Sequence, residues 1–368
     1  MTHPYRGRPD QAFWSRSVAG TVPELFDPVT EAPFVIRRGE KAAAAGSCFA
    51  QHISRFLLTE GFDALITEPG PLSPGAVDQG FGIFPARFGN VYTIRQMLQL
   101  LERAYSVYRP LDSAWAFEHG YVDPFRPRVQ TFDTVAALEA DRAAHLGAVR
   151  KMFEDCHVFV FTLGLTEAWQ RIEDEAVFPL APGVHGTPPD MADYGFVNFS
   201  AMQMQRDLLD FIDRLRMVNP SVRLILTVSP VSLAATYENR HVVVSTAASK
   251  AALRVVVDEV SRLRADVAYF PSYEIITGPQ ARGRFLAEDL REVNEAGVSA
   301  VMRVFRRHFL SGDPASTAWM SAVSAPSSLI NAHANGRSRG WPSSGSGCHV
   351  HDVTVPTLAT GTISVNGA

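Results

Sequence analysis

Short apolar runs recur along the chain between stretches of mixed polarity. Four of them cover residues 41–46, 157–162, 222–228 and 266–270, and the run at 157–162 is almost wholly apolar. A strand that helices cover on both faces has this composition, because neither face meets water. The pattern therefore predicts four buried strands, and residues 61–66 form a further predicted strand.

Amphipathic stretches lie between these runs. Apolar residues recur at helical spacing after residue 48, after the predicted N-cap Thr93, and in residues 134–153, 202–217, 247–263 and 298–309. Strands that alternate with helices build right-handed βαβ units, whose strands are parallel. We therefore predict an α/β protein of three layers, in which helices cover both faces of a parallel sheet.

Changes in composition divide the chain into three parts. Residues 1–30 mix proline, charge and isolated aromatic residues without a period, which indicates an irregular arm. Residues 31–310 contain the predicted strands and helices and form one domain, with loops expected at 114–128 and 180–200. Serine, glycine, alanine and proline dominate residues 313–368, so we predict a disordered tail whose removal leaves the melting temperature unchanged.

Charge and composition exclude several classes of function. Of the 368 residues, 46% are hydrophobic and 20% are charged, which is enough apolar material for a large core. The formal net charge of −4 and the pI near 6.3 provide no basic field, so nucleic acid is not an expected partner. No apolar run is long enough to cross a bilayer, and the first residues lack the apolar core of a signal peptide. We expect a cytoplasmic protein without a membrane partner, and its oligomeric state stays open.

Cysteine usage argues against disulfides and against a metal centre. Cys48, Cys156 and Cys348 lie far apart and form no CxxC pair, so a reducing compartment is expected. The string Cys348-His349-Val350-His351 contains metal-binding residue types. In a tail rich in serine and glycine such a tract is more often incidental than a site. We predict neither a bound metal nor another cofactor.

The candidate chemistry lies at the turn that follows the first strand. Gly46-Ser47-Cys48 ends an apolar run and precedes a helical stretch, so a strand, a turn and a helix are predicted there. The start of a helix favours negative charge, which would stabilise a Cys48 thiolate and could hold an oxyanion. The same corner occurs in many α/β proteins with no catalytic role, since small polar residues cap helices and cysteines are often buried.

Other predicted strands also end in reactive residue types. The strings that follow them are Gly164-Leu165-Thr166-Glu167, Ser229-Pro230 and Ser272-Tyr273-Glu274. Ligands bind beyond the carboxyl ends of parallel strands. The strand ends therefore predict one shared site, which strengthens the case for chemistry at Cys48.

Five strings, in order along the chain, carry a resemblance to a known family. They are Gly46-Ser-Cys-Phe-Ala50, Gly89-Asn-Val-Tyr-Thr93, Thr162-Leu-Gly-Leu-Thr-Glu-Ala-Trp169, Leu226-Thr-Val-Ser-Pro-Val231 and Tyr269-Phe-Pro-Ser-Tyr-Glu274. The sequence resembles the GSCFA family, which looks like a branch of the SGNH (GDSL-like) hydrolases. The resemblance covers about residues 30–310. It implies the flavodoxin-like three-layer fold of those hydrolases, and acyl-ester chemistry.

SGNH hydrolases resemble one another in a nucleophile turn, in oxyanion donors and in a late Asp-x-x-His. The resemblance places Cys48 in the nucleophile's position, with Ser47 as the alternative. Gly89 and Asn90 match the first oxyanion block. The second block, Gly-x-Asn, is matched by Gly164-Leu-Thr166, so a threonine hydroxyl replaces the amide as donor.

The late block departs from the family pattern. Asp289-Leu-Arg-Glu292 occupies its place, and Glu292 stands where the histidine is expected. His241, in the loop after Ser229, is the predicted substitute base, and His185 is the second choice. An isolated loop histidine is more often only solvated, but a cysteine nucleophile needs less help from a base than a serine.

Two functions are compatible with these residues. The first is an acyl-ester hydrolase or acyltransferase that acts on an acylated carbohydrate. The second is a non-catalytic module that binds a glycan or an acyl carrier and has lost the late histidine. Preferential labelling of Cys48 by a thiol probe, over Cys156 and Cys348, favours the enzyme.

Overall fold

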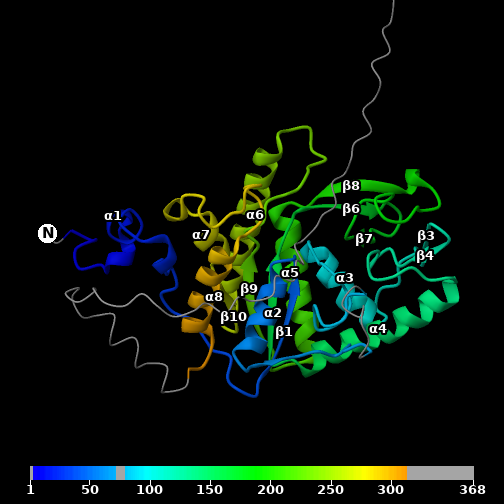
Figure 1. The fold of residues 1–368 in the computed structure, drawn as a ribbon, viewed down its shortest axis with the longest axis horizontal. Helices are drawn as coiled ribbons and strands as arrows, with labels where there is room; N and C mark the ends of the chain where they lie inside the picture. The colour runs from blue at the N-terminus through cyan, green and yellow to red at the C-terminus, as the bar shows by residue number, and fades with distance from the viewer. Residues whose placement is uncertain (1–2, 72–78, 313–368) are drawn as a thin grey trace, which may run out of the picture. The chain divides into compact units, whose positions relative to one another are not determined.

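We describe the protein from a computed structural model, which covers residues 3–71 and 79–312 (Figure 1). The predicted tail, residues 313–368, lies outside the described residues, and so does its Cys/His string.

The centre of the fold is a five-stranded parallel sheet. Its strands are β1 (Lys41–Gly46), β2 (Asp63–Ala64), β5 (Val158–Leu163), β9 (Arg223–Val228) and β10 (Val267–Tyr269), in the spatial order β10-β9-β5-β1-β2. Every pair is parallel, and the register aligns Gly46 with Thr162 and Thr162 with Thr227. This confirms the predicted strands and the parallel sheet.

Helices cover both faces of this sheet and so complete the predicted three layers. They are α2 (Ala50–Thr59), α3 (Ile94–Ala104), α4 (Val135–Asp155), α5 (Ala201–Val218), α6 (Val242–Leu263), α7 (Ser272–Thr277) and α8 (Glu295–Phe309). Buried residues of α3, α4, α5 and α6 pack on one face, and those of α2, α7 and α8 pack on the other. The amphipathic periods correctly located all of these helices except α7, which lies where only a loop was predicted. The helix α6 starts five residues before the predicted bound of residue 247.

The first strand divides the core into two halves. Successive side chains of a strand point to opposite faces. Ala43 and Ala45 accordingly join the core under α3 to α6, whereas Ala42 and Ala44 join the core under α2 and α8. All four alanines are at most 2% exposed, so the strand is buried on both faces and separates the two parts of the core with small side chains only.

Side-chain caps fix the starts of several helices. The Thr93 hydroxyl accepts from the Gln96 amide, and the Gln96 side chain accepts from the Thr93 amide, which makes a capping box. Thr134 caps α4 in the simpler way. Such caps satisfy backbone donors that the helix itself leaves without partners. The predicted N-cap at Thr93 is confirmed.

Two small sheets, which the sequence did not predict, lie within and next to the predicted loops at 114–128 and 180–200. The hairpin β3 (Trp115–Phe117) and β4 (Gly120–Val122) lies beside a three-stranded antiparallel sheet of β6 (Glu167–Arg171), β7 (Val177–Phe178) and β8 (Tyr194–Asn198) (Figure 1). A third apolar cluster, with Trp115 at its centre, packs beneath them. These strands are short, and every residue of β6 is half-buried. The sequence therefore shows no alternation of apolar and polar residues from which the strands could be predicted.

The described part of the N-terminal arm packs against the last helix. The arm contains α1 (Trp14–Ser17) and short 3-10 turns, and Arg303 of α8 donates hydrogen bonds to the carbonyls of Glu24 and Phe26. Next to this contact, Ile36 forms a parallel bridge with Leu310. The two flanks of the domain therefore meet at one edge of the fold.

Among the described residues, no helix is both long enough and apolar enough to cross a membrane.

Candidate functional site

The site lies where the strand order of the central sheet reverses. From one edge of the sheet to the other the strands are β2, β1, β5, β9 and β10. If these five strands are numbered 1 to 5 along the chain, this spatial order is 2-1-3-4-5, which is the flavodoxin-like arrangement. The reversal falls between β1 and β5, and ligands of such sheets bind beyond the carboxyl ends of the two strands that flank it. Those ends are Gly46 and Leu163 (Figure 1). The topology therefore favours a ligand site at the turn after β1.

A glycine makes this turn possible. Gly46 has a φ of +133°, and a Cβ at this position would clash with the backbone of Thr162 on the neighbouring strand. The chain then bends, the Ser47 amide donates to the Thr162 carbonyl (3.1 Å), and the Ser47 carbonyl accepts from the Ala50 amide (2.9 Å). Ser47 is buried and Cys48 is half-buried at the start of α2. Of the two candidate nucleophiles, Cys48 is thus the more accessible.

The loop from Gly89 to Tyr92 packs against the same turn. The Val91 amide donates to the Gly46 carbonyl (2.8 Å), and the Tyr92 carbonyl accepts from the Gly164 amide (3.1 Å). The Asn90 side-chain amide donates to the Tyr92 hydroxyl (3.0 Å). The predicted oxyanion block Gly89-Asn90 is thereby tied to both strand ends.

A close approach brings the end of β5 to the nucleophile turn. A Cβ on Gly164 would lie 3.2 Å from the Cβ of Ser47 and 3.1 Å from the Tyr92 carbonyl oxygen. Such distances are shorter than ordinary van der Waals contact, so the position has little room for a larger residue. Gly164 therefore allows the turn at Ser47 and the loop at Tyr92 to meet.

A buried lysine completes this cluster. Lys250 lies on α6, is 1% exposed, and its Nζ donates to the Gly164 carbonyl (2.7 Å). Burial lowers its pKa to about 7, against an opposing effect of the Cys48 thiolate and with a further lowering by Arg291. Its neighbour Ser249 accepts a hydrogen bond from the Thr166 amide (3.2 Å). The amine therefore interacts electrostatically with the candidate nucleophile and can be neutral near pH 7.

Lys250 is a candidate site residue that the sequence patterns did not single out. The signal was present, since Lys250 precedes the buried residues Leu253 and Val257 by three and seven positions and thus falls on the apolar stripe of α6. A lysine on such a stripe is rarely buried unless something pairs with it.

A model of the GSCFA family matches residues 41–305. The chain belongs to the GSCFA family. The match begins at β1 and ends within α8, inside the domain predicted at residues 31–310. No curated protein matches the sequence.

The late block of this GSCFA chain reaches the same region through an arginine. The Asp289 carboxylate accepts from the amides of Arg291 and Glu292 (both 3.0 Å), so it shapes its own turn. The Arg291 side chain donates to the Ser232 carbonyl (3.2 Å) and acts electrostatically on Lys250. Arg291 is thus the residue of this block that interacts with the site, because its charge lowers the pKa of Lys250.

The two predicted histidine bases lie in other surroundings. His241 is exposed and caps α6, where its Nδ1 accepts from the Val243 amide (3.2 Å). It precedes Lys250 by nine residues, which corresponds to about 13.5 Å along the helix axis. His185 stacks on Phe117 of the small hairpin at 4.1 Å. Neither histidine shares the hydrogen bonds that the GSCFA chain forms around Cys48 and Gly164.

The other predicted site residues are divided between the site and its surroundings. Ser229 is buried, and its amide donates to the Leu163 carbonyl (2.8 Å) at the end of β5. Thr166 is 2% exposed. Glu167 accepts from Thr236 (2.8 Å), and so belongs to the edge formed by the small sheet.

Glu274 has a structural set of partners. It accepts from Arg254 (2.8 Å) and from the Tyr269 hydroxyl (2.6 Å). Both bonds fix the start of α7 against α6 and β10. Within residues 3–71 and 79–312, no group of three or more His, Cys, Asp or Glu residues could hold a metal ion.

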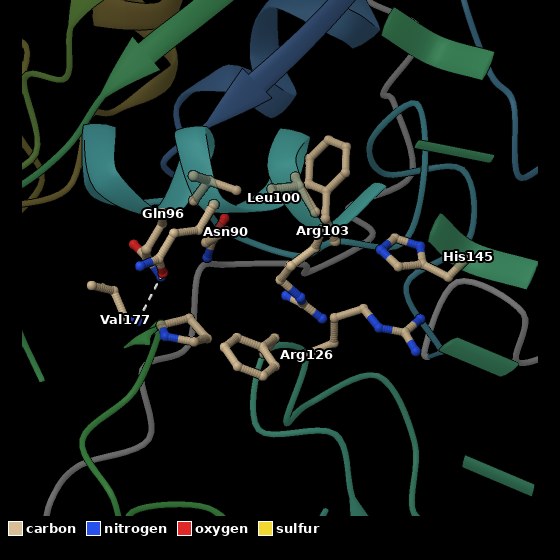
Figure 2. A pocket seen from close by; sticks show the side chains of 12 residues that line it. Asn90, Gln96, Leu100, Arg103, Arg126, His145 and Val177 are labelled. Carbon is tan, nitrogen blue, oxygen red and sulfur yellow. Dashed lines mark hydrogen bonds between the residues drawn. The ribbon is translucent and has the colours of Figure 1, made fainter. Parts of the chain in front are cut away.

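A pocket opens beside the Gly89–Tyr92 loop. Its volume is about 210 Å³, and its lining includes Gly89, Asn90, Tyr92 and Gln51 of α2. A smaller compartment of about 30 Å³ adjoins it and shares Asn90 and Arg126 with it (Figure 2). The candidate site therefore consists of the turn at Cys48 and a pocket next to a loop that packs against this turn.

Proposed function

We propose that this GSCFA protein is an acyl-ester hydrolase or acyltransferase in which Cys48 is the nucleophile and Lys250 the base. The acylated carbohydrate expected from the SGNH resemblance remains the proposed substrate class. The observation that carries the proposal is the buried amine of Lys250, which is held at the Gly164 carbonyl and interacts with Cys48 at the sheet reversal. Lysine takes the place of the histidine that the late block lacks.

The protonation states suit a base of this kind. A neutral amine can donate one hydrogen to the Gly164 carbonyl and keep its lone pair for the Cys48 thiol. Because the pKa of Lys250 is about 7, the amine can accept a proton near neutral pH and give it back. Proton transfer leaves a thiolate beside an ammonium ion, and each stabilises the other.

The reaction then proceeds in two balanced steps. The Cys48 thiolate attacks the ester carbonyl carbon, and the oxyanion forms beside the amides at the start of α2. The carbon–oxygen bond to the leaving alcohol breaks, and the alkoxide takes the proton that Lys250 received from the thiol. Water, or a second hydroxyl, next attacks the thioester and loses its proton to Lys250. The acid or new ester leaves, and the cysteine is restored.

Steady-state turnover of p-nitrophenyl acetate tests the assignment. We expect Cys48→Ala to abolish turnover, and Lys250→Met to lower kcat by about 10²–10⁴-fold, which is the usual contribution of a general base. Lys250→Arg separates the roles of this residue, because it keeps a cation but cannot accept a proton. Full activity in Lys250→Arg would show that charge alone is needed, and loss of activity in Ser47→Ala with retention in Cys48→Ala would move the nucleophile by one residue.

Labelling with iodoacetamide gives a readout that needs no substrate. Cys156 is the internal control, because burial raises the pKa of its thiol to about 12. We expect Cys48 to react faster than Cys156 at pH 7, and Lys250→Met to slow Cys48 alone. Equal, slow labelling of both cysteines would contradict the proposed thiolate.

A binding module is the second candidate function. Two observations favour it: Thr166 is almost fully buried, and the Asn90 amide already donates to Tyr92, so one predicted oxyanion donor is shielded from solvent and the other is engaged elsewhere. If Cys48→Ala and the wild type bind an acetylated glycan equally and neither turns it over, the binding function is supported. We also propose a cytoplasmic location, since a thiol nucleophile must stay reduced.

A further inference from the structure

The compartment behind the Gly89–Tyr92 loop has an unusual lining. Among the described residues, its ionisable side chains are Arg103 of α3, Arg126 of the loop after β4, and His145 of α4, the exposed Arg128 lines the outer compartment, and no carboxylate lines either compartment. All three side chains gather at one end, with Asn90 and Gln96 at the other (Figure 2). A buried space that is lined by two guanidinium groups, and by no anion among the described residues, is suited to a negatively charged group.

Several polar atoms of this lining have no hydrogen-bond partner among the described residues. They are Nη1 of Arg126, Nε2 of His145 and Oδ1 of Asn90, each shielded from solvent. Arg126 is 3% exposed and His145 is 1% exposed as whole residues. Buried polar atoms almost always have a partner, so these three are available for a bound molecule.

Neighbouring carboxylates hold the arginine and the histidine in place. Arg126 donates to Asp123 from Nε (3.1 Å) and to Asp141 from Nη2 (2.8 Å), which leaves Nη1 for the pocket. His145 donates from Nδ1 to Glu68 (2.7 Å), because a carboxylate can only accept. Burial and Arg126 lower the pKa of His145 to about 4, so Nε2 carries a lone pair and accepts.

Arg103 is the least restrained cation of the lining. Its guanidinium stacks on the Phe125 ring at 3.8 Å, and no salt bridge is formed by it within the described residues. Burial lowers its pKa to about 10, which still leaves it charged at neutral pH. It can therefore turn its donors to a ligand without breaking an ion pair.

The charge of the surrounding cluster limits the ligand to a single negative charge. Four guanidinium groups face three carboxylates, which leaves one positive charge in excess; they are Arg87, Arg103, Arg126 and Arg142, with Glu68, Asp123 and Asp141. A dianion would exceed that charge and would also face the lone pairs of His145 and Asn90. A carboxylate with a neighbouring hydroxyl offers two acceptor oxygens and a donor.

We propose that the inner compartment binds the carboxylate of a sugar acid, with Arg103 and Arg126 donating to its oxygens and His145 accepting from an adjacent hydroxyl. The inner volume of about 30 Å³ suits so small a group, and the outer volume of about 210 Å³ takes the sugar ring. Gln51 in the outer lining lies three residues after Cys48, one helical turn away. The outer compartment therefore borders the helix that follows Cys48. That an ester on this ring reaches Cys48 rests on the proposed function, whereas the carboxylate site does not.

Isothermal titration calorimetry of the Cys48→Ala protein with D-glucuronate tests the site without any turnover. D-glucose is the matched ligand, because it replaces the carboxylate by a hydroxymethyl group. We expect glucuronate to bind and glucose to show no binding at the same concentrations. Inorganic phosphate, added as a competitor at pH 8.5 where it is mostly the dianion, should not displace glucuronate, because it then carries more negative charge than the cluster can balance.

Arg103→Met is the decisive variant. It keeps an unbranched apolar stem against Phe125 and breaks no ion pair, so the fold should be retained. We expect it to weaken glucuronate at least about tenfold, as loss of a charge-assisted bond does. Arg150→Met is the control, since Arg150 is exposed, lies over Tyr105 and donates to the Ala104 carbonyl, outside the pocket.

The outcomes separate this inference from the proposed function. Equal binding of glucose and glucuronate, displacement by phosphate, or unchanged affinity in Arg103→Met would each overturn the sugar-acid site. Binding that depends on Arg103, in a protein that turns over no ester, would support the site and refute the enzyme. Ester turnover by the wild type, together with no binding of glucuronate to the Cys48→Ala protein, would support the enzyme and refute the site.

Discussion

Lys250 introduces a charge that folding must remove from water. Its pKa is about 7 in the folded protein, whereas an exposed lysine of the unfolded chain has a pKa of 10.5. Below pH 7 both states carry the proton, and the folded state bears the full cost of the buried charge. Between the two values only the unfolded chain holds the proton, so the free energy of unfolding rises with pH by up to about 1.4 kcal/mol per unit.

Lys250→Met should therefore be more stable than the wild type at pH 7, by about 3 kcal/mol once the lost hydrogen bond is counted. Urea denaturation at pH 7 and pH 9.5 measures the difference, and we expect the gap between the two proteins to narrow at the higher pH. A gap that stays constant between these pH values would mean that Lys250 is not neutralised on burial. Stability gained together with activity lost is typical of a functional residue.

Whole elements were predicted better than the site residues they carry. The runs at β5 and β9 were recognisable because both faces are covered, and helices such as α5 follow a simple amphipathic period. The antiparallel strands β6 and β8 were not, because their half-buried residues have no alternation. Lys250 was overlooked because its partner, the Gly164 carbonyl, lies 86 residues away in the sequence.

The turn after β1 depends on one missing side chain. Gly46→Ala adds a Cβ that meets the Thr162 backbone at a φ of +133°, where an L-residue is strained. We expect the free energy of unfolding to fall by about 3 kcal/mol or more, since neither strand can move without disturbing the sheet.

Gly147→Ala is the matched control for this change. Gly147 lies within α4, is exposed, and has open space where a Cβ would be placed. Alanine there should raise stability by about 0.5–1 kcal/mol through helix propensity. Urea denaturation of both variants checks the pair, and a mild effect at Gly46 would show that the turn can relax.

On the scale of the whole molecule, an ion-pair cluster joins segments that are distant in the sequence. Glu68 accepts from the Arg87 side chain (2.8 Å) and from His145 of α4 (2.7 Å). Burial works against its ionisation, but these bonds lower its pKa to about 2. The stabilisation is therefore present above pH 4.5, the ordinary pKa of a glutamate in the unfolded chain, and is lost as the pH falls toward 2.

Glu68→Gln should lose about 3 kcal/mol of unfolding free energy at pH 7, and the difference from the wild type should shrink through the window from pH 4.5 to 2. Chemical denaturation across this range measures it. Glu173→Gln is the control, because Glu173 is 72% exposed and pairs with Arg171 at 3.6 Å, so a change within about 0.5 kcal/mol is expected. A pH-independent loss in Glu68→Gln would point to packing instead of charge.

The bridge between Ile36 and Leu310 brings the first and the last residues of the domain next to each other. Adjacent strands lie about 5 Å apart, so a linker of a few residues could join position 311 to position 35 without stretching either partner. A circular permutant, opened at an exposed loop instead, should keep the core contacts of every helix and strand. Because the bridge is parallel, the chain reaches residue 35 from one end of the pair and leaves residue 311 at the other, so two tags attached there would share one edge of the domain and point in opposite directions.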